Sequence, residues 1–443
     1  MERGRDSLAV TFVGNATTVL RWHSFTLLTD PNFLHAGQLA HLGHGLTSKR
    51  LLEPAMQVEE LPADLDAVLL SHLHGDHWDR AVRRKLDRGT PIVTTPHASR
   101  RLQGWHGFRR ATGLRTWESQ DLLKHDTYVR VTALPAVHAP GLVRYLLPPV
   151  MGSLVEFCTV GGGPLLRLYI TGDTLLFDGV REIARRCPDI DVVIAHLGGT
   201  TIPGGLMVTM DARQGADLLE VVPARTLIPV HTDDYTVMKS SLADFLAEVR
   251  KVEGPVNLHL NSPGGDVFDG MAVYAALKRR EEPTTVIVDG LAASIASVIA
   301  LGADKVVMAP KAKMMIHDGW TAAAGNAADF RKLVALLDDT SNTIASVYAD
   351  KAGGDVEFWR ERMRAETWYT AEEALAAGLI DEIEGKARAR DDFDLSMFNY
   401  AGRENAPAPV LKPPVEKTVE PPAAPVVEDK KTVKEALAEW ETE

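Results

Sequence analysis

The sequence has few cysteines and no long apolar run, and both absences narrow the kind of protein it encodes. Only two of its 443 residues are cysteines, Cys158 and Cys187. Two thiols cannot build a disulfide framework, so a reducing compartment, the cytoplasm, is expected. No stretch of about eighteen apolar residues occurs, so no membrane-spanning helix is expected. Residues 1–6 also lack the apolar core of a secretory signal.

Blocks of basic residues are missing as well. The net charge is −12, and no long run of Lys and Arg is present. A nucleic acid is therefore not the expected partner, because binding phosphates requires a concentrated positive surface. The hydrophobic fraction of 45% and the charged fraction of 24% are those of a globular protein. A chain of this length predicts two or three domains.

The N-terminal part, residues 7–236, consists of short apolar runs separated by Gly, Pro, His and Asp. This rhythm is typical of many strands joined by functional loops. Four of the runs are predicted strands that polar residues follow directly: Ala67–Leu70, Arg167–Ile170, Val192–Ala195 and Thr226–Val230. Polar side chains that converge at strand ends are how a sheet builds a site.

After residue 240 the pattern changes to longer helices that alternate with short strands. The predicted helices cover residues 241–252, 267–280, 294–302 and 326–351, and the predicted strands are Val256–Leu260, Thr284–Val288 and Lys305–Met308. Thr370 opens another helix through a capping box with Glu373, and Gly378 ends it. Such alternation predicts a parallel sheet with crossover helices.

The C-terminal residues differ again in composition. Seven prolines occur after residue 403, among Val, Ala, Lys and Glu. We expect residues 391–430 to form an extended Pro-rich linker. Residues 431–443 return to helical spacing and predict a short amphipathic helix. That helix is either a fraying tail or a docking helix for a partner.

The run from His72 to His77 gathers three imidazoles and a carboxylate within six residues. His72 and His74 are two apart, so an extended chain points both rings to the same side. The turn at Gly75 then brings Asp76 and His77 to a second position. Imidazole and carboxylate ligands suit zinc, and also manganese or iron. The run therefore predicts a metal site rather than a polar loop with solvated histidines.

On these residues the sequence resembles the metallo-β-lactamase fold superfamily. The resemblance implies two divalent metal ions, expected to be zinc, with the first held by His72, His74 and His138. The second would be held by Asp76, His77 and His231, with Asp173 between the two ions. In this family a water bridging two cations becomes the nucleophile, and the cations neutralise the developing oxyanion. The resemblance also implies that Asp76 orients the hydroxide.

Residues 10–17 and Leu28–Pro31 resemble one branch of that superfamily. It contains the ascorbate-phosphate lactonase and phospholipase D-like enzymes that act on N-acyl phosphatidylethanolamine, so the implied substrates are lactones or phosphodiesters. Asp30 is expected to orient the loop that carries the metal ligands without binding metal itself. His196 follows a strand and either faces substrate or is a hydrogen-bonded structural histidine. The superfamily also includes nucleases, an alternative that the acidic net charge disfavours.

A second set of chemistry-bearing residues lies in the C-terminal part. Residues 261–266 end a strand with adjacent glycines, whose amides can point at an oxyanion. Ser294 stands at a predicted helix start, where the helix dipole favours alkoxide character. His317 ends a strand. Serine with histidine is the minimum for acyl transfer.

In this order and spacing, residues 241–384 resemble the Clp protease proteolytic subunit, most closely its phage-type relatives that mature viral heads. The resemblance implies Ser294 as nucleophile and His317 as general base, with the amides of Gly265 and Ile295 as oxyanion hole. Glu366 stands where the family usually has an aspartate and is expected to orient the imidazole. Such relatives form homo-oligomers and work with an ATPase unfoldase or inside an assembling shell of phage capsid and scaffold proteins.

The predicted fold class is therefore α/β, with an N-terminal αββα metallo-β-lactamase sandwich (1–240) fused to a Clp-protease or crotonase-like ββα spiral domain (241–390). The second family's first strand is missing, because the end of the metal domain takes its place. The join between the two halves has three possible origins: a natural fusion, a recombinant phage gene or a chimeric gene. The predicted function is a bifunctional hydrolase, a dinuclear metal hydrolase joined to a serine endopeptidase. In the alternative, one half, more readily the truncated second, is an inert assembly module.

Overall fold

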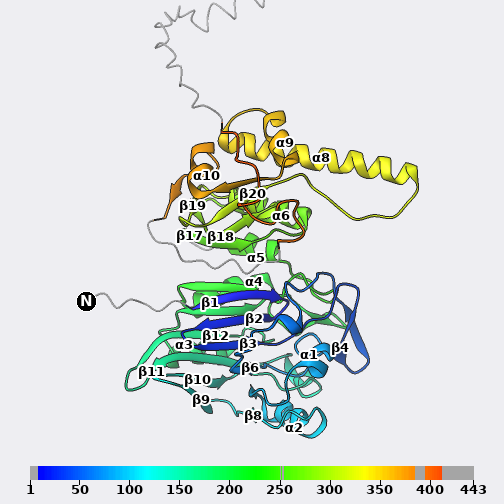
Figure 1. The fold of residues 1–443 in the computed structure, drawn as a ribbon. Coiled ribbons are helices and arrows are strands. Elements are labelled where there is room, and N and C mark those ends of the chain that lie inside the picture. The colour runs from blue at the N-terminus through cyan, green and yellow to red at the C-terminus, as the bar shows by residue number, and fades with distance from the viewer. Residues whose placement is uncertain (1–7, 250, 252–253, 385–394, 412–443) are drawn as a thin grey trace, which may run out of the picture. The chain divides into compact units, whose positions relative to one another are not determined.

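The computed structural model describes residues 8–249, 251, 254–384 and 395–411 (Figure 1). Its N-terminal part contains two six-stranded sheets. The first has the strand order β1 (Ala9–Gly14), β2 (Thr17–Trp22), β3 (Phe25–Thr29), β6 (Ala67–Leu69), β7 (Ile92–Thr94), β8 (Ala111–Gly113). The second has the order β16 (Thr226–Val230), β13 (Val192–His196), β12 (Pro164–Ile170), β11 (Gly152–Thr159), β10 (Thr127–Leu134), β9 (Ser119–Lys124).

Shorter elements and helices complete this part. They are β4 (Leu39–Gly43), β5 (Leu46–Lys49), β14 (Thr201–Ile202), β15 (Leu206–Met207), η1 (Val58–Glu60), η2 (Gly141–Tyr145), α1 (Arg80–Lys85), α2 (Pro96–Trp105), α3 (Asp178–Arg186) and α4 (Ala212–Val221). The strands β4 and β5 form a separate hairpin.

Three apolar clusters show how the layers are held. Leu27 of the first sheet and Val155 of the second lie in one buried cluster, which is the core between the sheets. Leu102 of α2 packs in a cluster with strands of the first sheet, and Leu218 of α4 does so with strands of the second. Along β10, buried residues alternate with less buried ones, as expected for a strand with one face on a core. The predicted αββα sandwich is confirmed.

The C-terminal part contains one mainly parallel sheet. Its strand order is β21 (Thr367–Thr370), β20 (Lys313–Ile316), β18 (Thr284–Ala293), β19 (Lys305–Met308), β22 (Glu382–Ile383), and β17 (Val256–Ser262) also pairs with β18. The helices are α6 (Val267–Lys278), α7 (Ile295–Ala300), α8 (Ala327–Ala352), α9 (Val356–Arg364) and α10 (Ala371–Ala377). Every pairing is parallel except that of β21 with β20. The capping box at Thr370 and the end at Gly378 are as predicted.

The segment that joins the two parts shows which elements occupy the place of the missing first strand of the C-terminal family. The strand β16 pairs in parallel with β13 and is thus built into the N-terminal part. Helix α5 (Leu242–Val249) places Phe245 and Val249 in an N-terminal cluster. Leu246 of the same helix also packs against the C-terminal cluster. The predicted domain boundary at residue 240 therefore lies just before α5, whose side chains pack in both an N-terminal and a C-terminal apolar cluster.

The composition predicted that residues 391–430 form an extended linker, but part of this segment is folded. Within the expected linker, residues 395–406 contain the buried Phe398 and pack against the C-terminal sheet. The predicted helix at 431–443 lies outside the described residues. Among the helices that are described, none is both long and apolar enough to cross a membrane.

Candidate functional site

Hydrogen bonds to Asp30, Asn15 and His41 help to fix the loop that follows β6, which carries His72 to His77. The amide of Ser71 donates to Oδ1 of Asp30 at 2.7 Å, and Nδ2 of Asn15 donates to the carbonyl of Asp76 at 2.6 Å. The amide of Gly75 donates to the carbonyl of His41 in the β4–β5 hairpin at 2.9 Å. A Cβ at position 75 would lie 2.6 Å from the His41 nitrogen, so only glycine allows this approach.

The first candidate metal position is formed by three histidines. Nε2 of His72 lies 2.9 Å from Nδ1 of His74, which lies 3.2 Å from Nε2 of His138. Two nitrogens bound to one tetrahedral zinc are about 3.3 Å apart, given Zn–N bonds of about 2.0 Å. Burial and then the neighbouring His138 lower the pKa of His74 to about 3, and burial lowers the pKa of His138. Both rings are therefore neutral at pH 7, the form that binds metal.

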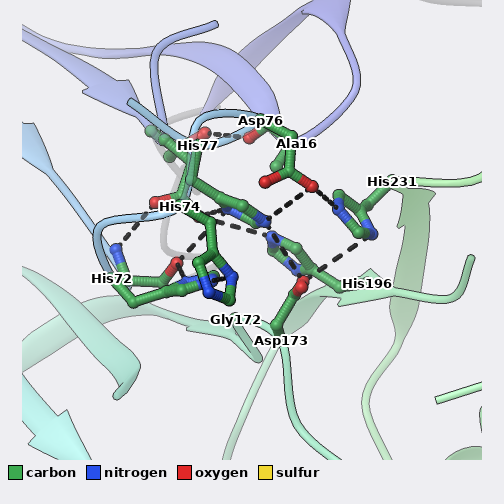
Figure 2. A network of polar contacts seen from close by, with 12 residues as sticks. Ala16, His72, His74, Asp76, His77, Gly172, Asp173, His196 and His231 are labelled. Atoms are coloured by element: carbon green, nitrogen blue, oxygen red, sulfur yellow. Dashed lines mark hydrogen bonds and ion pairs between the residues drawn. The ribbon is translucent and has the colours of Figure 1, made fainter. Parts of the chain in front are cut away.

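The second candidate position lies beside the first. Oδ2 of Asp76 is 3.3 Å from Nε2 of His231 and 3.8 Å from Nε2 of His77. Oδ1 of Asp173 is 3.4 Å from the same nitrogen of His77, and Asp173 also forms a compact group with His72 and His77. Figure 2 shows these side chains converging from separate elements. Asp173 thus lies near residues of both candidate positions, and its bridging role stays a prediction.

Several polar atoms of this cluster are buried and make no hydrogen bond within the described residues, although some of them lie in ion-pair range of one another. They include Oδ1 of Asp76, Nε2 of His77, Oδ1 of Asp173 and Nδ1 of His231. Buried polar atoms normally find a hydrogen-bond partner. Buried nitrogen and oxygen atoms that converge from four side chains without hydrogen bonds are the donor set that a metal ion would satisfy. The histidine and aspartate groups therefore fit a metal-binding hydrolase.

Outer contacts fix the ring orientations of three histidines. Nδ1 of His138 lies 2.9 Å from the Val208 carbonyl, and Nδ1 of His72 lies 2.9 Å from Oγ of Ser71. The imidazole of His77 turns its Nδ1 towards Asp30. Each contact leaves Nε2 directed into the site, which is the usual arrangement around metal-binding imidazoles.

His196 is fully buried next to this cluster. Its ring stacks on that of His77, with centroids 5.9 Å apart. Its Nε2 lies 3.4 Å from Oδ2 of Asp30, and its Nδ1 lies 3.2 Å from Oγ1 of Thr171. These contacts match the hydrogen-bonded structural alternative, and the substrate-facing role of His196 stays a prediction.

The serine and histidine of the C-terminal part meet directly. Oγ of Ser294 lies 2.7 Å from Nε2 of His317. Ser294 has φ 55° and ψ −132° immediately before α7, a conformation rare for a side-chain-bearing residue and typical of strained functional positions. Gly264 approaches so closely that a Cβ there would lie 2.7 Å from Cβ of Ser294. Gly265 and Ile295, the predicted oxyanion-hole residues, are the chain neighbours of Gly264 and Ser294.

Glu366 is buried close to this pair, but its hydrogen bonds go elsewhere. Its carboxylate accepts from the amides of Asn399 and Tyr400, each at 2.7 Å, and from the indole of Trp368 at 3.2 Å. No hydrogen bond among the described residues joins it to His317. The orienting role of Glu366 stays a prediction. Residues 398–400 were not predicted to lie at this site, although the aromatic side chains of Phe398 and Tyr400 stand out within a proline-rich tail.

The comparisons with known proteins follow the same division of the chain. A family model described as "Beta-lactamase superfamily domain" matches residues 26–232, and one described as "Clp protease" matches residues 226–387. Residues 226–232, which contain β16, are therefore matched by both. The second match thus begins at the strand that the N-terminal sheet incorporates.

Curated relatives match the C-terminal part. The chain is 35% identical over 133 residues to an ATP-dependent Clp protease proteolytic subunit 1 of Chlamydia abortus, covering 29% of this chain and 69% of that protein. It is 29% identical over 187 residues to the ATP-dependent Clp protease proteolytic subunit of Leuconostoc citreum, covering 41% and 94%. Among solved structures, a possible metal-dependent hydrolase from Veillonella parvula matches with a TM-score of 0.47 and 20% identity, covering 55% of this chain and 92% of that one.

Proposed function

Because the chain belongs to the Clp protease family through residues 226–387 and matches the beta-lactamase superfamily over residues 26–232, we propose that it is a bifunctional hydrolase. Its N-terminal part is a dinuclear metal-dependent hydrolase, and its C-terminal part is a serine endopeptidase. Both matched families are hydrolase families. The proposal adds two metal ions, a substrate class and a peptidase mechanism.

The observation that carries the first activity is the convergence of seven buried ligand-type side chains. We assign one ion to His72, His74 and His138, and a second to Asp76, His77 and His231, with Asp173 shared. Divalent ions bound there would lower the pKa of a coordinated water towards neutrality. The two oxygens of Asp76 allow it to orient the attacking water while binding metal. Zinc suits this donor set, and manganese or iron also fit it.

A hydrolysis assay tests this activity and its substrate class. Lactones and phosphodiesters are the classes that the resemblance to the lactonase and phospholipase branch supports. We expect turnover of one class that a chelator abolishes and that His74→Ala lowers at least about hundredfold. The control is His35→Ala, which removes a half-exposed histidine paired with Glu53. Turnover that persists in His74→Ala and in chelator contradicts the assignment.

The peptidase is supported by the 2.7 Å contact between Ser294 and His317. Oγ of Ser294 attacks the peptide carbonyl carbon, and its proton passes to Nε2 of His317. The same proton then goes to the leaving amine as the C–N bond breaks, and water hydrolyses the acyl-serine. The amides of Gly265 and Ile295 are assigned to the carbonyl oxygen, where negative charge develops.

A fluorophosphonate probe tests the nucleophile. The full chain should be labelled at one position, and Ser294→Ala should abolish labelling. Ser119→Ala, in an exposed strand of the N-terminal part, should label normally. Folded protein that fails to react contradicts the peptidase. That result favours an inert C-terminal assembly module, an alternative to which the hydrogen bonds of Glu366 give some support.

A homo-oligomer is part of the proposal, since Clp proteolytic subunits are typically oligomeric. The first half of α8 exposes Phe330, Val334 and Leu336 at 45%, 57% and 49%. Apolar side chains gathered on one solvent-facing helix are typical of contact surfaces. We expect light scattering to give a mass above that of one chain, and replacement of Val334 with Asp to lower it.

A further inference from the structure

A segment beyond the predicted peptidase domain packs against its candidate site. We name residues 395–406 the strap. The ring of Phe398, which is 6% exposed, meets the rings of His317 and Trp368 edge-on, with centroids 5.6 Å and 5.8 Å away. Phe398 also shares a buried cluster with Met315, whose carbonyl accepts from the amide of Ser294 at 2.9 Å. Phe398 therefore packs directly against the imidazole of His317 and against the strand whose backbone hydrogen-bonds to Ser294.

The backbone of the strap fixes Glu366. The amides of Asn399 and Tyr400 each donate to one oxygen of this buried carboxylate, and Trp368 adds a third donor. No ion pair with Lys or Arg is present for Glu366 among the described residues. A buried carboxylate requires hydrogen-bond donors to replace the water it loses. The strap thus supplies two of the three donors that hold Glu366.

The strap has a second attachment away from the site. The guanidinium of Arg403 donates twice to the carboxylate of Glu373, at 2.7 Å and 3.2 Å. Glu373 lies in the first turn of α10 and also closes the capping box with Thr370. A two-point contact of this kind fixes direction as well as distance. Both attachments follow Phe398 directly in the chain, at residues 399–400 and at residue 403.

We propose that the strap is part of the peptidase site, and that Phe398 is a positioning residue that keeps the imidazole of His317 against Ser294. This inference rests on the proposed peptidase. The charged groups that face His317 are Glu366 and Asp318, and Asp318 is paired with Arg360 of α9. Phe398 adds an apolar wall to this setting. Without its ring, water enters beside the imidazole, which can then turn away from Ser294.

The test measures fluorophosphonate labelling against pH in the full chain. Phe398→Ala should react about tenfold more slowly, as expected for a displaced base. The pH midpoint of its rate should rise, because water beside the ring relieves the burial that lowers the pKa of His317. Phe398→Leu keeps apolar cover and should restore most of the rate. The control Leu375→Ala changes an apolar side chain of α10 that lies outside the strap and is 41% exposed, and it should behave as wild type.

For Phe398→Ala, either of two results overturns the inference. One is an unchanged rate and midpoint in folded Phe398→Ala. The other is faster labelling of that variant, which would make the strap an obstruction to the site. A titration of His317 by NMR gives the midpoint without requiring labelling, so it tests Phe398 even where the proposed peptidase fails. If Phe398→Ala does not fold, Phe398→Leu should still show a small rise, and an unchanged His317 midpoint there also overturns the inference.

Discussion

The Asp30 carboxylate lies 3.2 Å from Nδ1 of His77, the nitrogen that points away from the candidate metal position. Burial alone would raise the pKa of Asp30, but His77 and His196 lower it to about 2. Asp30 is thus ionised at neutral pH. An ionised carboxylate behind an imidazole fixes the ring and makes its other nitrogen a better donor.

Asp30→Asn is therefore expected to weaken metal binding at the second position by about ten- to hundredfold. Competition with a chromogenic chelator measures this change. Asp126→Asn, in the exposed turn between β9 and β10, is the matched control and should bind metal as wild type does. Equal affinity in the Asp30 variant would show that His77 needs no orienting partner.

Gly75→Ala tests the contact between the ligand loop and the β4–β5 hairpin. The new Cβ would lie 2.6 Å from the backbone nitrogen of His41, so the hairpin or the loop must shift. We expect a loss of about 1–3 kcal/mol in stability and reduced metal content. Gly163→Ala, where nothing lies within 4 Å of the new Cβ, should change neither. Thermal unfolding and elemental analysis of both variants check this prediction.

Gly264→Ala tests the approach of the glycine turn to Ser294. Gly264 has φ +101°, and its Cβ would lie 2.9 Å from the Ala293 carbonyl as well as close to Ser294. We expect fluorophosphonate labelling to fall at least about tenfold, by displacement of the nucleophile. Gly353→Ala shares the strain of a positive φ but adds no close contact. Its labelling should be normal, and equal labelling of the two variants would contradict the geometry.

The pH dependence of labelling in the wild-type chain follows from the surroundings of His317. Burial lowers its pKa below the ordinary value of 6.5, while Glu366 and Asp318 oppose this effect. The neutral ring is the base, so labelling should be lost only when the pH falls through a midpoint below 6.5. A rate profile between pH 5 and 8, in roughly half-unit steps, measures it. A midpoint at or above 6.5 would contradict the buried, neutral imidazole.

The closeness of the candidate metal ligands could be predicted from the sequence. His72 to His77 are neighbours in the chain, and Asp173 and His231 follow β12 and β16, which run parallel on either side of β13. Carboxyl ends of parallel strands meet at one edge of a sheet. The role of His196 could not be decided from the sequence. Whether it faces substrate or is structural depends on side-chain contacts with Asp30 and Thr171 rather than on its position in a strand.

The strap shows where sequence reasoning fails. Prolines, charges and small residues around it predicted an extended linker. Phe398 is buried through ring contacts with Trp368 and His317, which are distant from it in sequence. Likewise, β16 satisfies the pattern of both families, and only its pairing with β13 assigns it to the N-terminal sheet. Local patterns predict helices and strands, whereas the burial of Phe398 and the pairing of β16 depend on residues far away in the sequence.

Elemental analysis of the purified full-length chain tests the proposed two-metal hydrolase most directly. The account predicts about two divalent ions per folded chain, with a lower content in His74→Ala and an unchanged content in His35→Ala. Metal-free protein prepared without chelators, and still metal-free after incubation with zinc, manganese and ferrous iron, would contradict it.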